Sequence, residues 1–503
     1  MNTIIIKRVR SLLAASLLAI ILVACGQSGQ DGEQATTADA AAAKVPITTS
    51  SDEARALFLQ GRALFDDLRF VDAYEVFEQA VAADDGFATG YFMLASAAQT
   101  NADFFGALAK ANELAANASD GEQLYIKAAV AGSENDQAAQ RDALEQLVAL
   151  YPQDERTHNA LGNFLFGQQD FAGTITHLNH AIAIAPEFAA PYNSLGYSHR
   201  SLEDFDSARV AFEKYVELNP DEANPYDSLA ELLMETGDYE ESISNYRKAL
   251  ERNRSFAASY AGITINYSLM GEADLAQEAA DQMLAAARTF GERQGAMFRS
   301  VTSHLYAGNT DAAMEVCDVI LAEAVVEGNH GAMGGISEYM GDIMMVAGDT
   351  AKAEEFFDAA YDHRLQANIN EANKAQAGRT HLFKTAIASM IGDDAEAGAS
   401  RTAEYVAAAE ANGTAFEKRR AHELSAYLAM FSEENEAAAA HFEQASQQQP
   451  IVLYWSAVVN RELGNMDKAR DLAERAANRN TLSANLPFFR ADAIALLAEL
   501  SAG

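Results

Sequence analysis

Apolar and polar residues alternate along most of the chain with the three- and four-residue spacing of a helix that is buried on one side. Two successive stretches illustrate this spacing: Leu229, Leu232 and Leu233, then Ile243, Tyr246 and Leu250. Gly237 lies between them, and a glycine in this place is typical of a helix end. The pattern predicts amphipathic helices joined in pairs by short turns, and therefore an all-α fold.

The helix pairs recur every 34 residues. Equivalent positions carry similar side chains in successive units: Phe171, Phe205 and Tyr239, then Ala181, Tyr215 and Ala249. Units that fit the period begin at residues 54, 88, 121, 155, 189, 223 and 257. Later starts, near 294, 334, 380, 419 and 450, are more widely spaced and predict longer helices or inserted turns. The count is about twelve repeats, which favours a solenoid over separate globular domains.

These units resemble the tetratricopeptide repeat, in which an antiparallel helix pair forms every 34 residues. Leu161-Gly162 and Leu195-Gly196 match the position where the first helix of that repeat carries a small residue. The resemblance implies an α-solenoid that winds as a right-handed superhelix with a concave inner face. We expect a regular array over residues 51–290, divergent repeats over 291–483 and a capping helix over 484–503.

The first 24 residues have the layout of an export signal. Lys7, Arg8 and Arg10 precede an apolar run over residues 12–23 that is too short to span a bilayer comfortably as a mature helix. The sequence Leu22-Val23-Ala24-Cys25 resembles the lipobox of bacterial lipoproteins, in which the signal is removed before the cysteine and the cysteine is then acylated. The resemblance implies a signal peptide over 1–24 and lipidation of Cys25. An ordinary export signal or a membrane anchor is the alternative.

The residues after the cysteine bear on location. In Gram-negative lipoproteins an aspartate there commonly retains the protein in the inner membrane, and this chain has Gly26. The resemblance therefore implies a lipid anchor in the outer membrane, with the protein facing the periplasm. Residues 25–50 are mainly Gly, Gln, Ser, Thr and Ala, which predicts a flexible tether.

The net charge of the chain limits the classes of partner that it can bind. The chain has 73 acidic and 36 basic residues, a formal charge of -37. Such a surface repels phosphate backbones and anionic headgroups, so we expect no nucleic-acid partner and membrane contact through the lipid anchor only.

Motifs that carry catalysis are not apparent. The sequence has no phosphate-binding glycine loop, zinc-binding helix or serine elbow of the usual spacing, and we expect no enzyme activity and no cofactor. His177 and His180, three residues apart, have a spacing that suits one metal, but two exposed polar side chains explain it as well. Neighbouring His158 and His199 fill positions where aromatic rings usually pack, and we expect no metal site. Cys317 occupies a packing position in a second helix.

The concave face is where we expect a partner to bind. In tetratricopeptide proteins, recurring positions of the first helix line this groove, and the resemblance places nine residues there: Asn159, Asn163, Phe166, Asn193, Tyr197, Arg200, Asn224, Asp227 and Glu231. Asparagine amides both donate and accept hydrogen bonds, so a row of them can bind a peptide backbone of any sequence. Arg200 is a candidate partner for a carboxylate. The alternative is that these residues are only solvated polar groups.

Two functions fit these features. The first is a non-enzymatic scaffold that binds a protein or peptide during envelope assembly, secretion or polymer export. The second is a surface lipoprotein that captures glycans, as in the starch-utilisation family. Sugar-binding surfaces usually expose aromatic rings, whereas Trp455, the only tryptophan, falls in a first helix where core packing is expected.

Overall fold

The computed structural model describes residues 44–67 and 69–502, and over these residues the protein consists of α-helices, two 3₁₀ helices and no strand. The predicted all-α fold is therefore confirmed. Residues 1–24, Cys25 and the predicted tether as far as residue 43 lie outside the described residues. Every helix in the described part of the chain is too short or too polar to cross a lipid bilayer.

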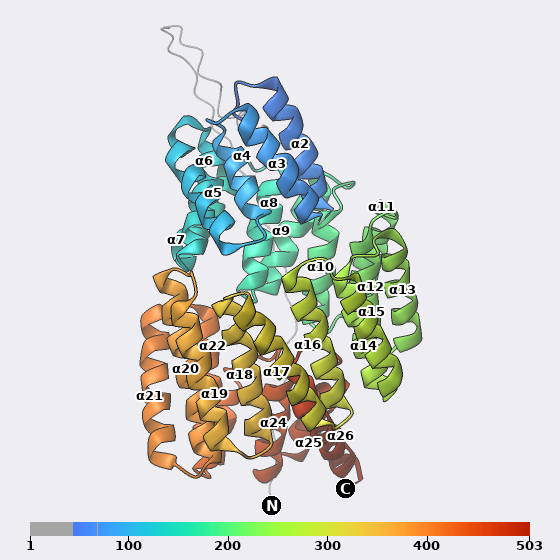
Figure 1. The fold of residues 1–503 in the computed structure, drawn as a ribbon, viewed down its shortest axis with the longest axis vertical. Helices are drawn as coiled ribbons and strands as arrows, with labels where there is room; N and C mark the ends of the chain where they lie inside the picture. Colours follow the sequence, from blue (N-terminus) through green and yellow to red (C-terminus); the bar gives the residue numbers. More distant parts are fainter. Residues whose placement is uncertain (1–43, 68, 503) are drawn as a thin grey trace, which may run out of the picture.

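The helices form antiparallel pairs that stack side by side along a curved path (Figure 1). We call the first helix of each pair helix A and the second helix B. The first six pairs are α2 (Asp52–Asp66) with α3 (Phe70–Ala83), α4 (Ala88–Ser96) with α5 (Asn101–Leu114), α6 (Asp120–Ser133) with α7 (Gln137–Leu150), α8 (Glu155–Gly167) with α9 (Phe171–Ile184), α10 (Ala190–Ser201) with α11 (Phe205–Leu218), and α12 (Ala223–Glu235) with α13 (Tyr239–Arg252). A 3₁₀ helix, η1 (Ala115–Asn117), precedes α6.

Six further pairs and a single helix complete the solenoid. They are α14 (Ala257–Met270) with α15 (Ala273–Ala286), α16 (Phe290–Tyr306) with α17 (Thr310–Val326), α18 (His330–Val346) with α19 (Thr350–Gln366), α20 (Glu371–Ile391) with α21 (Ala395–Asn412), α22 (Ala415–Phe431) with α23 (Asn435–Phe442), and α24 (Pro450–Glu462) with α25 (Met466–Asn478), then η2 (Leu486–Phe488) and α26 (Arg490–Ala502). Helices α16 to α22 contain 17 to 21 residues each, so longer helices account for the wider spacing beyond residue 290.

Small residues let the two helices of a pair approach closely. A Cβ atom added at Gly196 of α10 would lie 2.5 Å from the ring of Phe212 on α11, which is fully buried. The turn between α12 and α13 places Gly237 at φ +87°, in the left-handed region that glycine enters without steric cost. The equivalent turns of the three preceding pairs hold non-glycine residues in the same region: Asn135, Gln169 and Glu203, at φ 61°, 62° and 62°.

These three left-handed turn residues belong to the third, fourth and fifth pairs, and they contact residues of the tenth to twelfth pairs or of the loops that follow them. Asn135 donates to Asn412 at 3.4 Å, and Gln169 donates to Ser446 at 3.3 Å. Glu203 accepts hydrogen bonds from Arg475 at 3.0 and 3.2 Å. We call this set of contacts the joint. It closes the superhelix, because turns of early pairs rest on loops and helix ends of late pairs.

The C-terminal end departs from the predicted capping helix over 484–503. The helix begins at Arg490, and residues 479–489 form an irregular inner segment that lies on helix A residues of α12, α16 and α18. Arg299 of α16 donates to the carbonyl of Leu482 at 3.5 Å, and the Tyr339 hydroxyl of α18 donates to the carbonyl of Ala484 at 2.7 Å. Pro487 explains the later start, because proline disfavours helix at its own position and before it.

Candidate functional site

The candidate site is the concave wall formed by helix A of successive pairs. Local capping fixes where these helices begin. Ser119 accepts from the N–H of Glu122 while Glu122 accepts from the N–H of Ser119, a capping box at the start of α6. Asp154 accepts from the N–H of Arg156 at the start of α8.

A cavity of about 290 Å³ opens in this wall between α2, α4, α6 and α8. Aromatic side chains form much of its lining: Phe58, Phe65, Phe92 and Tyr125. Arg156 donates to Asp66 at 3.0 Å, whereas Arg62 has no ion pair with the described residues. Burial and the nearby charge of Arg156 lower the pKa of Arg62. The cavity thus combines apolar rings with a cationic group.

The segment over residues 44–50 lies along the same wall and contributes Val45, Pro46 and Ile47 to the cavity. The N–H of Val45 donates to Asp154, and the N–H of Thr48 donates to Glu122, both at 2.8 Å. Helix A starts therefore hold an extended chain through its backbone donors. Sequence reasoning did not identify this contact, although the Ser119–Glu122 capping pattern could have located one of its acceptors.

Glu122 shows how strongly this contact is made. Its side chain is only 1% exposed, and it accepts hydrogen bonds from the Thr48 backbone, the Thr89 hydroxyl and Ser119. Burial alone would raise the pKa of Glu122, but the hydrogen bonds outweigh burial and the pKa is lowered. Glu122 is therefore held as a carboxylate, the form that accepts hydrogen bonds best.

Two of the nine predicted groove residues retain free hydrogen-bonding capacity. Asn159 lies in the cavity wall on α8, and Asn193 occupies the equivalent place on α10. The Oδ1 atoms of both are buried and have no hydrogen-bond partner within the described residues. A buried amide without a partner is costly, so a ligand that donates to it gains stability.

Two more of the nine residues make local contacts. Asn163 of α8 accepts from the Ser194 hydroxyl of α10 at 2.7 Å. Phe166 packs on Phe171 with ring centroids 5.6 Å apart. Asn163 is exposed and Phe166 half-buried.

Three of the predicted residues form a network across α10 and α12. Arg200 makes ion pairs with Glu231 at 2.8 Å and with Glu235 at 2.9 Å. Tyr197 donates to Glu231 at 2.9 Å. Burial alone would lower the pKa of Arg200, but Glu231 and Glu235 outweigh it and raise the pKa. Arg200 is thus neutralised within the protein, which leaves less of its charge for the carboxylate anchoring that the sequence suggested.

The last two predicted residues are buried in α12. Asn224 donates to the Tyr215 hydroxyl at 3.0 Å, and Asp227 accepts from the Ser259 hydroxyl at 2.7 Å. Burial raises the pKa of Asp227 to about 7, although the bond from Ser259 opposes the shift. Twelve of the thirteen residues of α12 are buried, so this helix is part of the solenoid's interior as well as of its concave wall.

The histidines and the thiol have structural surroundings. His158 and His177 lie with their Nδ1 atoms 3.2 Å apart, and the His180 ring centroid is 5.2 Å from that of His158. The described residues contain no group of three or more His, Cys, Asp or Glu side chains arranged to hold a metal. Cys317 is fully buried in α17, and burial raises its pKa to about 12, as expected for a packing residue.

Comparison with known families identifies the repeats. Residues 189–222 and 223–256 match one tetratricopeptide-repeat model, and residues 423–484 match another. The chain therefore carries tetratricopeptide repeats, and over the described residues its fold is an all-α tetratricopeptide solenoid. No curated protein sequence matches the chain.

Solved structures with a similar fold share little sequence with it. A tetratricopeptide repeat protein from Parabacteroides merdae is 13% identical, with 52% of this chain and 99% of that chain covered and a TM-score of 0.38. The Cut9–Hcn1 hetero-tetramer of the APC/C is 14% identical, with 86% and 78% covered and a TM-score of 0.40. YrrB, described as having an unusual peptide-binding site, is 14% identical, with 38% and 96% covered and a TM-score of 0.27.

Proposed function

We propose that this protein is a non-enzymatic scaffold that binds an extended segment of another protein along the concave wall of its first pairs. The observation that carries the proposal is the pair of buried, unpartnered amides at Asn159 and Asn193. They occupy equivalent places on neighbouring helices, and one extended peptide would meet both once the side chains turn toward the groove, because their oxygens are buried in the unbound protein. Backbone N–H groups are the donors that every peptide presents there.

The protein's own segment over residues 44–50 supports this proposal. It shows that the same wall accommodates an extended chain, with backbone N–H groups bound by Asp154 and Glu122. The cavity beside it leaves room for side chains of a second segment. Partner binding would therefore reuse contacts of a kind that the fold already makes.

We further propose that the scaffold is a lipoprotein anchored in the outer membrane through Cys25 and facing the periplasm, in envelope assembly, secretion or polymer export. The support is the order of cationic start, apolar run and lipobox in the sequence, followed by Gly26. The glycan-binding alternative gains nothing from Trp455, which is half-buried and packs on Tyr454 with centroids 4.9 Å apart.

The groove is tested by replacing both amides. With Asn159→Ala plus Asn193→Ala, capture of the partner from detergent-solubilised envelopes should fall by about tenfold, because two buried hydrogen bonds are lost. Asn179→Ala, an exposed asparagine on helix B of the α8–α9 pair, is the matched control and should capture normally. Circular dichroism should show the same helix content in all variants. Equal capture by the double variant would place the binding surface elsewhere.

The anchor is tested separately. Cys25→Ala should move the protein from the membrane fraction to the soluble periplasmic fraction, because acyl chains supply the membrane affinity. Mass spectrometry of the mature N-terminus would identify the acylated cysteine directly. Membrane association that persists without Cys25 would contradict the anchor and leave the groove proposal intact.

A further inference from the structure

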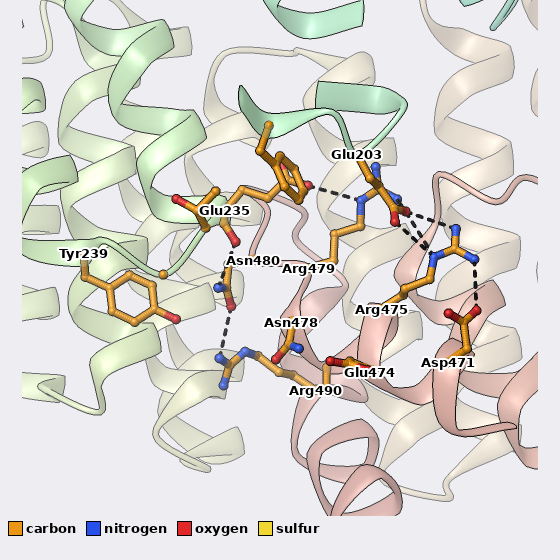
Figure 2. A pocket seen from close by; sticks show the side chains of 14 residues that line it. Glu203, Glu235, Tyr239, Asp471, Glu474, Arg475, Asn478, Arg479, Asn480 and Arg490 are labelled. Carbon is orange, nitrogen blue, oxygen red and sulfur yellow. Dashed lines mark hydrogen bonds and ion pairs between the residues drawn. The ribbon is translucent and has the colours of Figure 1, made fainter. Parts of the chain in front are cut away.

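A cavity of about 590 Å³ lies at the joint, away from the groove of the first pairs. Figure 2 shows that its walls come from two distant parts of the solenoid: the turns that precede α11 and α13, in the middle of the chain, on one side, and α25 with the residues that follow it on the other. Its size is that of a small-molecule site. Nothing in the proposed scaffold function requires it.

Most charges in this cavity are already paired. Arg475 binds Glu203 with two hydrogen bonds, at 3.0 and 3.2 Å, and Arg479 makes ion pairs with Glu203 at 3.4 Å and with Glu235 at 3.3 Å. These pairs connect α25 and the residue after it to the early turns. We assign them to holding the joint together, and they leave little charge for a ligand.

Arg490 differs from these arginines. Its Nη2 donates to the Oδ1 of Asn480 at 3.1 Å, but none of the described residues places a carboxylate within 4.0 Å of its guanidinium. Its Nε atom is buried and has no hydrogen-bond partner in the described part of the chain. A guanidinium carries five donors and a permanent charge, so an unsatisfied buried face is costly. Figure 2 shows this side chain extending across the cavity toward Tyr239.

A second buried donor without a partner lies close to Arg490. The hydroxyl of Tyr306, at the end of α16, is buried and makes no hydrogen bond with the described residues. Tyr306 packs against the core cluster that contains Phe489, the residue before Arg490, and burial raises the pKa of Tyr306. Tyr306 is not part of the cavity lining, whereas Tyr239 lines the cavity together with Arg490, and none of the described carboxylates pairs with this cation.

We propose that this cavity binds a small monocarboxylic acid, whose carboxylate accepts hydrogen bonds from Arg490 and from the Tyr239 hydroxyl. Phe205, Ala477 and the ring of Tyr239 offer apolar surface to the rest of the molecule. Asp471 and Glu474 are exposed at the cavity and repel additional negative charge, as does the net charge of -37. A singly charged carboxylate is therefore favoured over a phosphate dianion.

The site would couple ligand binding to the joint. Tyr239 begins α13, in the sixth of the twelve pairs, whereas Arg490 begins α26, so a bound acid connects the middle of the chain to its end. A ligand that binds only the closed form stabilises it by mass action.

The test uses the purified protein with acetate, benzoate and inorganic phosphate as probes. Isothermal titration calorimetry should detect millimolar or tighter binding of benzoate, with a rise in Tm, and weaker binding of acetate, which lacks the apolar part. Arg490→Gln should weaken benzoate binding by about 10- to 100-fold, because a charge-assisted hydrogen bond is lost. Arg461→Gln, an arginine of α24 outside the cavity, is the matched control and should bind as the unmodified protein does.

A second variant separates a loss of ligand binding from a loss of folding. Tyr239→Phe removes only a hydroxyl and should weaken benzoate binding by a few fold while the Tm without ligand stays the same. Absence of heat and of a Tm shift with both carboxylates would overturn the proposal, as would undiminished binding by Arg490→Gln. Phosphate bound more tightly than benzoate would overturn the ligand class. None of these outcomes bears on the groove variants.

Discussion

The concave wall of the first pairs and that of the later pairs are built from the same kind of helix, yet the later wall is covered where part of the first wall stays open. Along α2, α4, α6 and α8 the segment over residues 44–50 leaves a cavity, and Asn159 in its lining and Asn193 on the next helix A keep unpartnered amide oxygens. Along α16 and α18 the inner segment over residues 479–489 lies on the wall, and Leu486 within it is fully buried. The later wall is thus bound by a segment of the same chain.

This difference shows what the wall binds well. The inner segment is irregular, its carbonyl groups accept from Arg299 and Tyr339, and its Phe488 ring packs 5.6 Å from that of Tyr339. Backbone hydrogen bonds and a few apolar anchors are the features of peptide recognition by grooves. We infer that the concave wall of the first pairs binds a segment of another protein through the same kinds of contact.

The largest effect should come from separating the two regions at the joint. Glu235 is 4% exposed and makes ion pairs with Arg200 and Arg479. Glu235→Ala leaves both guanidinium groups buried without this partner, and should lower the free energy of unfolding by about 3–5 kcal/mol. Urea denaturation measures the loss. Glu462→Ala, which removes an exposed ion pair, should change it by less than about 1 kcal/mol. Equal effects of the two variants would mean that the joint contributes nothing.

A somewhat smaller effect should come from loosening the inner segment. Leu486→Ala removes a fully buried side chain from the last core cluster and should cost about 2–4 kcal/mol. Leu202→Ala, at a position that is 52% exposed, should cost less than about 0.5 kcal/mol. Limited proteolysis should cut the variant within residues 479–489 before it cuts the unmodified protein. If the first cuts fall among α2 to α8 instead, the comparison between the two walls fails.

The smallest effect concerns α12, which lies between the two regions. The pKa of Asp227 is about 7 in the folded protein and near 3.8 in an unfolded chain. The folded state therefore binds this proton more tightly, and the group's contribution to stability falls as pH rises from about 4 to about 7. Asp227→Asn keeps an acceptor for Ser259 and removes the titration. At pH 4 the unmodified chain should have the higher Tm. By pH 8 the Tm of the variant should have risen relative to that of the unmodified chain. A difference that is constant with pH would contradict the raised pKa.

The helix pairs could be predicted from the sequence because the interactions that form them are local. Apolar stripes such as Leu229, Leu232 and Leu233, and small residues such as Gly196, repeat within 34 residues and form contacts with the next pair. The prediction that Asn159 and Asn193 line the groove used the same period and stays a prediction. The partners of Arg200 did not, because no local rule selects Glu231 and Glu235 among so many carboxylates.

No sequence pattern predicted the contacts between distant parts of the chain. Asn135 and Asn412 are 277 positions apart, and nothing near either residue indicates the other. The inner segment was missed for a different reason: its alanines and leucines fit a helical pattern, and Pro487 was the one residue that argued against it. Local sequence patterns predict each helix pair, whereas the curvature of the whole stack determines which distant pairs contact each other.

The joint also changes how the molecule should come apart. A straight stack of repeats has only neighbours to hold each unit, so it can fray from either end while the middle survives. Here the third, fourth and fifth pairs rest on the last ones, and loss of the C-terminal pairs removes support from the beginning of the chain as well. Melting is therefore expected to be more concerted than the linear order of the units suggests, with both ends of the chain losing protection from hydrogen exchange together.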